Sequence, residues 1–202
     1  MKNKVLVFGA QGQLGKCIQD LKKNSNTNWV YADLSEVDIT QHSETEKYIT
    51  SINPNIIINC SAYTAVDNAE IEKNLAYKVN ALAVENLAKL SKQIQAKFIH
   101  ISTDYVFDGR KNTPYTEDEK TNPLNVYGAS KLEGEILANK VNSDIAIIRT
   151  SWLYSEYGKN FAKTMLNLGK EKEEIKVIFD QTGTPCYAGD LAKAILKITD
   201  LY

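Results

Sequence analysis

Cysteine is scarce in this sequence, and its three copies lie far apart. Cys17, Cys60 and Cys186 form no Cys-x-x-Cys pair, and no cluster of histidines accompanies them. An odd number of scattered cysteines indicates neither a disulfide framework nor a zinc site. Cys60 lies in an apolar run, where we expect a small core residue. The sequence therefore predicts no metal site and favours a reducing, cytoplasmic environment.

An excess of charge of either sign is also missing. The 24 basic and 25 acidic residues leave a formal net charge of −1, while 43% of the residues are hydrophobic. This balance gives no electrostatic reason to expect nucleic-acid or membrane binding, and the hydrophobic content excludes a disordered chain. No apolar run approaches a membrane span, and the first residues lead into a predicted strand rather than a signal peptide. We expect one domain with a small appended lobe.

The first motif is a short apolar run followed by closely spaced glycines. Residues 5–8 suit a strand that is buried on both faces. The glycines follow at intervals of three, at Gly9, Gly12 and Gly15. Helical spacing of apolar residues begins at Leu14, so a helix N-terminus would face a pyrophosphate that approaches this loop. An ordinary strand–turn–helix with incidental glycines is the alternative, and we favour a dinucleotide site.

An acid ends the second predicted strand. Residues 28–32 are followed by Asp33, about twenty residues after the glycines. An acid there can accept hydrogen bonds from both hydroxyls of an adenosine ribose, although a strand-end Asp often just begins a turn. We favour the ribose role. Thr40 is expected to cap the next helix, and Ile39 suits either an adenine face or a plain core contact.

Strands and helices alternate along the rest of the chain. Further buried strands are predicted at 56–60, 98–101, 145–148 and 175–179. Helices are predicted at about 66–95, from Pro123, after Gly158 and from a cap at Asp190. This alternation implies an α/β fold, a doubly wound, Rossmann-like parallel sheet with right-handed crossovers. We expect a dinucleotide-binding domain at 1–150 and a small, incomplete substrate lobe at 151–202, with the last sheet strand interleaved.

Two polar residues stand inside otherwise apolar elements. Asn80 lies in the middle of the predicted 66–95 helix, where it is either buried with a specific partner or exposed. His100 lies inside a predicted strand and is more consistent with a hydrogen-bonded core residue than with a catalytic one. His42 lies in a polar segment and is expected to be solvated. The predicted chemistry therefore does not depend on histidine.

A tyrosine and a lysine lie four residues apart on one predicted helix. Tyr127 and Lys131 share a helix face, so a lysine ammonium there would lower the pKa of the phenol. A tyrosine tuned in this way can donate a proton to a carbonyl oxygen that accepts a hydride. Thr103, at the end of a strand, can hydrogen-bond the same oxygen. The pair alone is a weak signal, but after a nucleotide-binding strand and a Ser-Thr-Asp strand end it favours a reductase.

Taken together, these motifs resemble the extended short-chain dehydrogenase/reductase family. The matching segments are 9–15, 102–109, 122–128, 149–154, 160–161 and 180–181, and the resemblance covers the whole chain. It implies that Tyr127 is the proton donor, Lys131 its partner and Thr103 the third catalytic residue. The implied reaction is NADPH- or NADH-dependent reduction of the 4-keto group of dTDP-4-dehydro-L-rhamnose to dTDP-L-rhamnose, a step in making nucleotide sugars for polysaccharides.

The resemblance also implies which residues line each ligand. The cofactor would contact residues from the glycine loop, the two acid-containing turns and the catalytic helix, namely Gly9, Gly12, Gln13, Leu14, Gly15, Asp33, Asp38, Ile39, Ala62, Tyr63, Thr64, Tyr127 and Lys131. The sugar nucleotide would contact Thr103, Asp104, Trp152 and Asn160. No metal ligand is implied.

The sequence departs from the family pattern at two places. Members usually carry a further C-terminal stretch that completes the substrate lobe, so these 202 residues are expected to bind a sugar nucleotide weakly. Some members form metal-linked dimers through glutamates near the first helix, where Lys16 and Cys17 stand here. We expect a monomer or a weak homodimer. The final helix is expected to pack partly on the lobe around Phe161 and Met165.

Two alternatives to the reductase remain open. One is another sugar-nucleotide enzyme of the same family, a dehydratase or an epimerase. Dehydratases carry an acid after Thr-Asp, whereas Tyr105 stands there in this chain. The other is a non-catalytic, reductase-like regulatory module, against which the intact set of Thr103, Tyr127 and Lys131 argues.

Overall fold

The centre of the molecule is a five-stranded parallel sheet with strand order β2-β1-β3-β4-β5. The computed structural model describes residues 3–22, 27–178 and 180–202. Its strands are β1 (Lys4–Phe8), β2 (Asn28–Ala32), β3 (Ile56–Asn59), β4 (Lys97–Thr103) and β5 (Ile145–Thr150). The order reverses between β1 and β3, which is where open parallel sheets bind ligands. The predicted doubly wound α/β fold is confirmed.

Apolar side chains fill both faces of the sheet, which explains the near-continuous hydrophobic runs of its strands. Leu6 and Phe8 point into one core and Val5 and Val7 into the other, all at most 1% exposed. Each such buried side chain contributes roughly 1.5–3 kcal/mol relative to an exposed one. The two cores hold the central strands between helical layers.

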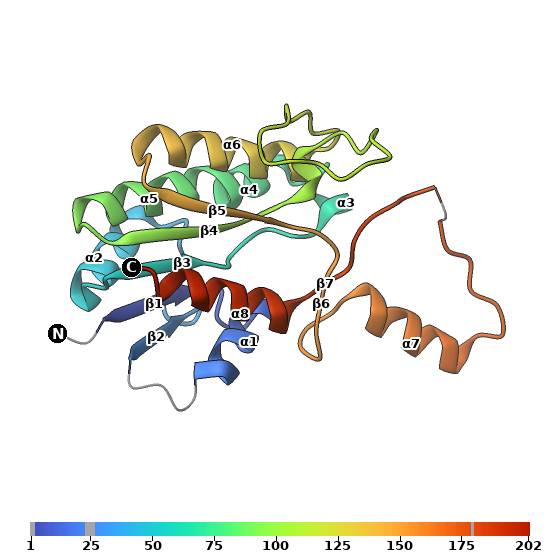
Figure 1. The fold of residues 1–202 in the computed structure, drawn as a ribbon, viewed down its shortest axis with the longest axis horizontal. Helices are drawn as coiled ribbons and strands as arrows, with labels where there is room; N and C mark the ends of the chain where they lie inside the picture. Colours follow the sequence, from blue (N-terminus) through green and yellow to red (C-terminus); the bar gives the residue numbers. More distant parts are fainter. Residues whose placement is uncertain (1–2, 23–26, 179) are drawn as a thin grey trace.

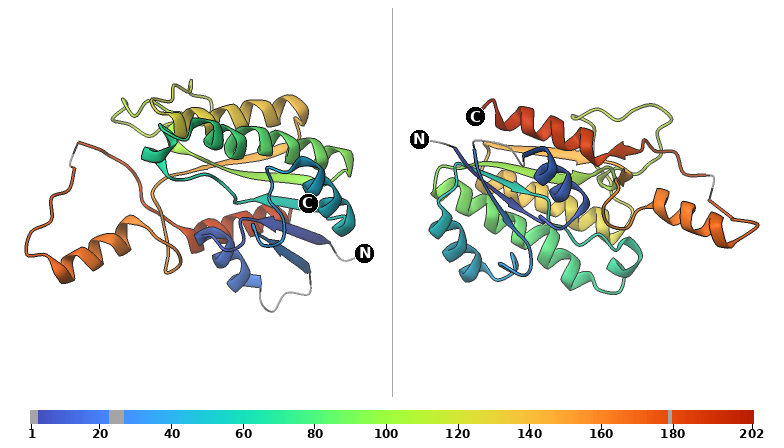
Figure 2. Two further views of the ribbon diagram at one scale, coloured as in Figure 1. Left: turned by 180° about the vertical axis from the view of Figure 1, so that it is seen from behind. Right: turned by 90° about the horizontal axis from the view of Figure 1, so that it is seen from below.

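Helices cover the two faces of the sheet in separate layers (Figures 1 and 2). On one face lie α2 (His42–Ile52), α5 (Ala83–Gln93) and α6 (Val126–Val141). On the other lie α1 (Gln13–Lys22) and α8 (Ala188–Thr199), which pack against each other. Ile195 and Leu196 of α8 are buried against the sheet and α1. The expectation that α8 packs on the lobe around Phe161 is therefore wrong, because the sheet offers it the larger apolar surface.

The predicted long helix at 66–95 is broken into shorter pieces. The structure has α3 (Val66–Ala69), α4 (Lys73–Tyr77), a π-helical turn η1 (Lys78–Leu82) and then α5. The π turn contains Asn80 and is packed closely against α6, where a Cβ on Gly134 would lie 2.1 Å from the Asn80 carbonyl oxygen. A π turn of this kind inside a helix is often found at functional sites.

Three predicted helix starts shift by a few residues. Asn125, not Pro123, begins α6, and its Oδ1 accepts a hydrogen bond from Gly128 N at 2.7 Å. Thr40 is not the cap of α2, since its hydroxyl donates to Asp38 Oδ1 at 2.8 Å and Gln41 is the N-cap residue. Asp190 lies in the first turn of α8, where its charge suits the helix dipole, rather than at the cap position.

The predicted sixth strand at 175–179 is wrong over residues 175–178, which adopt no strand, and Phe179 lies outside the described residues. Val177 and Ile178 are exposed, and this apolar run joins neither sheet. A separate two-stranded sheet forms instead from β6 (Leu153–Tyr154) and β7 (Cys186–Tyr187). Between them, α7 (Phe161–Glu171) projects away from the main sheet (Figure 1).

No helix among the residues that the structure describes is long and apolar enough to cross a membrane. A short 3-10 turn, η2 (Asp104–Val106), follows β4 and begins the loop that leads to α6.

Candidate active site

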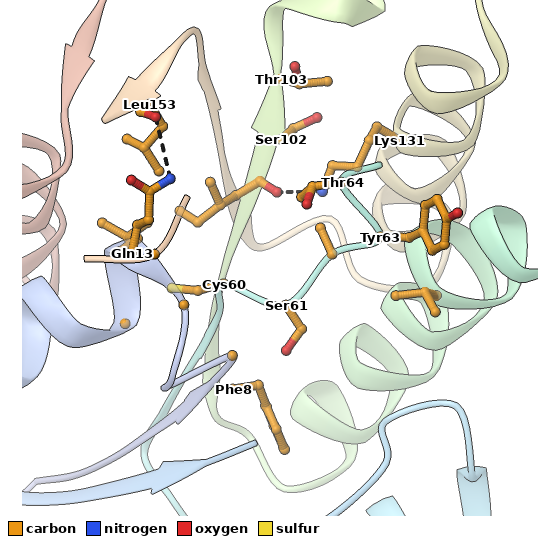
Figure 3. Close-up of a pocket in the computed structure, with 18 of the residues that line it drawn as sticks. Phe8, Gln13, Cys60, Ser61, Tyr63, Thr64, Ser102, Thr103, Lys131 and Leu153 are labelled. Carbon is orange, nitrogen blue, oxygen red and sulfur yellow. Dashed lines mark hydrogen bonds between the residues drawn. The ribbon is translucent and has the colours of Figure 1, made fainter. Parts of the chain in front are cut away.

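A cleft of about 1060 Å³ lies beyond the carboxyl ends of β1, β3, β4 and β5 (Figure 3). Every residue predicted to bind the cofactor lines it, from Gly9 in the first loop to Lys131 on α6. Thr103, Asp104 and Trp152 of the predicted substrate set line it as well. Asn160 does not line the cleft, although its side chain contacts Gln13, which does. Segments far apart in the sequence therefore meet in one place.

The glycine loop between β1 and α1 requires glycine for close backbone packing. Gly9 has φ +73°, and a Cβ there would lie 2.6 Å from Ser61 N. A Cβ on Gly15 would lie 2.4 Å from the Gly9 carbonyl oxygen, whereas one on Gly12 would meet that oxygen at 3.2 Å. The first-turn N–H groups of α1 have no acceptor within the helix. The loop thus offers a cradle and a helix N-terminus suited to a phosphate.

Asp33 is tied to the glycine loop. Its Oδ2 accepts a hydrogen bond from Gln11 N at 2.8 Å and its Oδ1 accepts one from Leu34 N at 2.9 Å. The carboxylate therefore lies beside the loop and lines the cleft. Burial raises the pKa of nearby Asp38, but hydrogen bonds from the Thr40 N–H and hydroxyl outweigh it, so the pKa lies below its usual value. Ile39 lines the cleft and also packs in the core.

Asn80 fixes the backbone of the loop that follows β3. This side chain is fully buried: its Oδ1 accepts from Tyr63 N at 2.8 Å, and its Nδ2 donates to the Tyr63 carbonyl at 3.1 Å and to Ser130 Oγ at 3.0 Å. Of the two alternatives for Asn80, the buried one with specific partners is confirmed. The two hydrogen bonds between Asn80 and the Tyr63 backbone hold this loop, whose residues Ala62, Tyr63 and Thr64 line the cleft.

The three predicted catalytic residues lie together at the cleft. Thr103 ends β4, and Tyr127 and Lys131 come from one face of α6. Burial raises the pKa of Tyr127, opposed by a hydrogen bond with the Thr103 side chain and reinforced by the Asp104 carboxylate. Burial also raises the pKa of Asp104. A phenol in this environment stays protonated at neutral pH.

The side chain of Lys131 bonds to the neighbouring strand β4. Its Nζ donates to the Ile101 carbonyl at 2.6 Å and lies 3.3 Å from His100 Nε2. Burial lowers the pKa of Lys131 to about 8, opposed by Glu135. The expectation that Lys131 lowers the pKa of Tyr127 is therefore wrong for this arrangement, because burial and Asp104 govern the phenol.

Comparison with known proteins places this site in a family. A family model described as "RmlD substrate binding domain" matches residues 2–201. The chain belongs to this family. It is 44% identical over 198 residues to a dTDP-4-dehydrorhamnose reductase of Aggregatibacter actinomycetemcomitans, covering 98% of this chain and 67% of that protein.

Solved structures of relatives share the fold closely. A dTDP-4-dehydrorhamnose reductase from Clostridium acetobutylicum is 46% identical with a TM-score of 0.95, over 98% of this chain and 70% of that one. One from Bacillus anthracis str. Ames, solved in complex with NADP, is 45% identical with a TM-score of 0.96, over 99% and 71%. The chain therefore spans about two thirds of the length of these relatives.

The segment between β6 and α7 is hydrogen-bonded to Gln13, the first residue of α1. Asn160 is the N-cap of α7, and its Nδ2 donates to Gln13 Oε1 at 2.9 Å and to the Ser155 carbonyl at 2.8 Å. Ser155 Oγ also donates to Gln13 Oε1, at 3.2 Å. The polar atoms of Asn160 thus hold protein groups, while Trp152, with φ +42° and 43% exposed, is open to the cleft.

Two hydroxyl groups at the cleft were not predicted from the sequence. Ser102 Oγ and Thr150 Oγ1 are buried without a hydrogen-bond partner, and both residues line the cleft. Thr150 lies in register with Thr103 at the ends of β5 and β4. Ligands bind beyond the carboxyl ends of parallel strands, and both hydroxyl groups lie at such ends, so this position is the sequence signal that points to them.

Proposed function

We propose that this chain catalyses the NAD(P)H-dependent reduction of the 4-keto group of dTDP-4-dehydro-L-rhamnose to dTDP-L-rhamnose. One observation carries the proposal: Thr103, Tyr127 and Lys131 meet at one cleft with the glycine loop. The 44% and 46% identity to dTDP-4-dehydrorhamnose reductases supports this choice of substrate within the family. The product would serve polysaccharide biosynthesis.

The cleft fits a dinucleotide cofactor. Gly12 and the N-terminus of α1 would hold the pyrophosphate, Asp33 the adenosine ribose, and Lys131 the second ribose. Ser102 Oγ and Thr150 Oγ1 are buried hydroxyls in need of a partner at the same cleft. When bound, the reduced nicotinamide supplies the hydride. The relative from Bacillus anthracis, solved with NADP, supports this cofactor class.

The proton would come from Tyr127. Its raised pKa keeps the phenol protonated near neutral pH, so it can give its proton to the 4-keto oxygen as C4 is reduced. Thr103 lines the cleft at the end of β4, and its hydroxyl would hold the same substrate oxygen. The carbonyl thereby becomes a hydroxyl, with its proton from Tyr127 and its hydride from the cofactor.

The decisive experiment is NADPH and NADH oxidation by this chain with dTDP-4-dehydrorhamnose and with competing 4-keto sugar nucleotides. Preferred turnover of dTDP-4-dehydrorhamnose supports the proposal. Conversion of a sugar nucleotide without net oxidation of the cofactor would favour the epimerase or dehydratase alternative. Cofactor binding without turnover of any substrate would favour a non-catalytic module.

The proposal includes a setting for the enzyme. A reduced dinucleotide is a cytoplasmic reductant, and all three cysteines are free thiols, so we place the activity in the cytoplasm, in a monomer or weak homodimer without a nucleic-acid partner.

A further inference from the structure

Gln13 belongs to the glycine loop by its backbone and to a distant segment by its side chain. It is the first residue of α1, so its N–H is one of the first-turn groups that have no acceptor within the helix. Its Oε1 accepts from Asn160 Nδ2 at 2.9 Å, and its Nε2 donates to the Leu153 carbonyl at 3.4 Å. Figure 3 shows Gln13 reaching from α1 to Leu153. These hydrogen bonds join parts of the chain that lie far apart in the sequence.

One face of α1 holds the same segment at further points. Gln13, Lys16 and Asp20 share this face, since they follow helical spacing. The Lys16 ammonium lies 5.7 Å from the ring centroid of Tyr157, and the Tyr157 hydroxyl donates to the Asp20 carboxylate. Ser155 is 5% exposed, and its Oγ lies 3.2 Å from Gln13 Oε1. The turn between β6 and α7 is therefore attached to α1.

Gly158 lets this turn pass close to the Gln13 side chain. Its φ is +61°, and an added Cβ would lie 3.0 Å from Gln13 Cγ. Lys163 Nζ donates to the Gly158 and Glu156 carbonyls at 2.8 and 2.9 Å, which ties the turn to the first turn of α7. The hydrogen bonds of Gln13 are thus part of a packed contact.

The attached segment begins beside residues 151–153, which line the cleft and are called the Trp152 wall below. The indole of Trp152 packs against Gly183, where an added Cβ would lie 2.5 Å from Cε2. Leu153 is the last residue of this wall and accepts the hydrogen bond from Gln13. The glycine loop lines the same cleft. Gln13 therefore connects two walls of one cleft.

Ordering one of these walls lowers the entropic cost of ordering the other. A phosphate bound at the first turn of α1 would fix Gln13, and a fixed Gln13 would hold the segment behind the Trp152 wall. The effect is reciprocal, because a coupling free energy between two binding sites acts equally in both directions.

We propose that Gln13 is a positioning residue that couples the phosphate cradle to the Trp152 wall, so that the cofactor and the ligand at that wall bind cooperatively. The identity of that second ligand, a sugar nucleotide whose 4-keto carbon must meet the hydride donor, rests on the proposed function. The contact itself does not.

Hydrogen exchange of the ligand-free chain is the first test. Gln13→Met keeps the length of the side chain but removes its hydrogen bonds. Exchange over residues 153–161 should become about fivefold faster, which corresponds to the loss of one net hydrogen bond. Gln93→Ala, at the exposed end of α5, is the matched control and should leave this exchange unchanged. Unchanged exchange in Gln13→Met would overturn the proposal without any ligand or turnover.

Asn160→Asp reaches the same contact from the other side and serves as a second variant in case Gln13→Met does not fold. Its carboxylate still accepts from Lys163 N, the N-cap bond of α7, but it cannot donate to Gln13 Oε1. Exchange over residues 153–161 should rise as in Gln13→Met. The double variant should exchange little faster than either single variant, because both remove one contact. Fully additive effects would show that Asn160 and Gln13 act separately and would overturn the proposal.

The second test measures the coupling between ligands. The affinities of NADP⁺ and dTDP are determined alone and with the other ligand at saturation. Each ligand should tighten the other about fivefold or more in the unmodified chain, and this factor should fall toward one in Gln13→Met. In turnover, Gln13→Met should raise the KM for the sugar nucleotide more than it lowers kcat. A factor of one in the unmodified chain, or an equal factor in the variant, would overturn the proposal.

A chain that binds NADP⁺ but not dTDP would count against the proposed function alone. The coupling would then be measured as the protection of residues 153–161 from hydrogen exchange when NADP⁺ binds. This protection should be present in the unmodified chain and lost in Gln13→Met. Equal protection in both chains would overturn the proposal.

Discussion

At the scale of single residues, the clearest assignment is that of the proton donor. Tyr127 is buried and close in space to Tyr105, whose ring meets it edge-on with centroids 5.4 Å apart. Tyr63 and Tyr105 also line the cleft, but Tyr127 is the buried phenol of the three. In the proposed reaction, its hydroxyl matters for chemistry and little for packing.

Tyr127→Phe should therefore abolish turnover while leaving cofactor affinity nearly unchanged, with a loss on the order of 10²–10⁴-fold, typical for a general acid. Cofactor titration and NADPH oxidation, measured in parallel, check this. Lys131→Ala should differ by weakening cofactor binding, since Lys131 is proposed to hold the second ribose. Near-normal turnover in Tyr127→Phe would remove the phenol from the mechanism.

A second prediction at this scale concerns Asp33 and the preference between NADH and NADPH. Its carboxylate accepts from Gln11 N and Leu34 N at the glycine loop, so its charge would lie close to a ribose 2′ position and repel a 2′-phosphate. Asp33→Asn keeps an acceptor for Gln11 N but removes the charge. The preference should shift toward NADPH by something on the order of 1 kcal/mol, a several-fold change in the ratio of affinities.

Affinities for NADH and NADPH in Asp33→Asn, beside the unmodified chain, measure this shift. Asp200→Asn, which removes an exposed carboxylate after α8, is the matched control and should leave the ratio unchanged. Raising the salt concentration should reduce the effect, because Asp33 is partly exposed. If the ratio of NADH affinity to NADPH affinity is the same in Asp33→Asn as in Asp200→Asn, then Asp33 is not near the ribose.

At the scale of elements, the contact of α6 with the π turn η1 links packing to the site. Gly134 lets α6 approach so closely that an added Cβ would lie 2.1 Å from the Asn80 carbonyl oxygen, a backbone atom. Asn80 in turn clamps Tyr63. The helix contact therefore holds one wall of the cleft.

Gly134→Ala should destabilise the fold by about 1–3 kcal/mol through overpacking, despite the better helix propensity of alanine. Displacement of η1 should also weaken cofactor binding. Gly169→Ala in α7 is the control, because its Cβ would meet only Ile175 Cδ1 at 3.9 Å, and it should be neutral or stabilising. Urea unfolding and cofactor titration report both effects. A Gly134→Ala variant as stable as the unmodified chain would mean that α6 can shift without cost.

The elements also show where sequence reasoning succeeds and fails. Runs such as 5–8 and 56–58 became strands because both of their faces are covered. Residues 175–178 have a similar composition but stay exposed and unpaired, and composition alone does not distinguish the two cases. The π turn at 78–82 was also not predicted, and its close partner Gly134 lies some fifty residues later in the sequence.

For the site, local spacing was enough to place the glycine loop, Asp33 and the Tyr127/Lys131 pair at one cleft. Their roles in binding and catalysis stay predictions. The contacts of His100 with Asn59 and Lys131 were not predictable, because they join three elements through buried side chains of ordinary appearance. The direction in which Lys131 points, and with it the pKa of Tyr127, also needed the three-dimensional arrangement.

At the scale of the whole molecule, the parts of the chain around the cleft differ in burial. The loops after β1 and β3 are held by the contacts of Asp33 and Asn80. By contrast, α7 has no buried residue, and Leu166 is 67% exposed. The chain spans about two thirds of the length of its relatives.

We therefore expect this 202-residue chain to bind NAD(P)H firmly and a dTDP-sugar weakly, and to self-associate through the exposed apolar residues of α7. Calorimetry with each ligand and sedimentation across a concentration range test the two parts. Leu166→Gln should reduce self-association while leaving cofactor affinity unchanged, because Leu166 does not line the cleft. Tight, saturable dTDP-sugar binding by a monomer would show that the substrate side needs nothing further, and that the exposed face of α7 has no part in it.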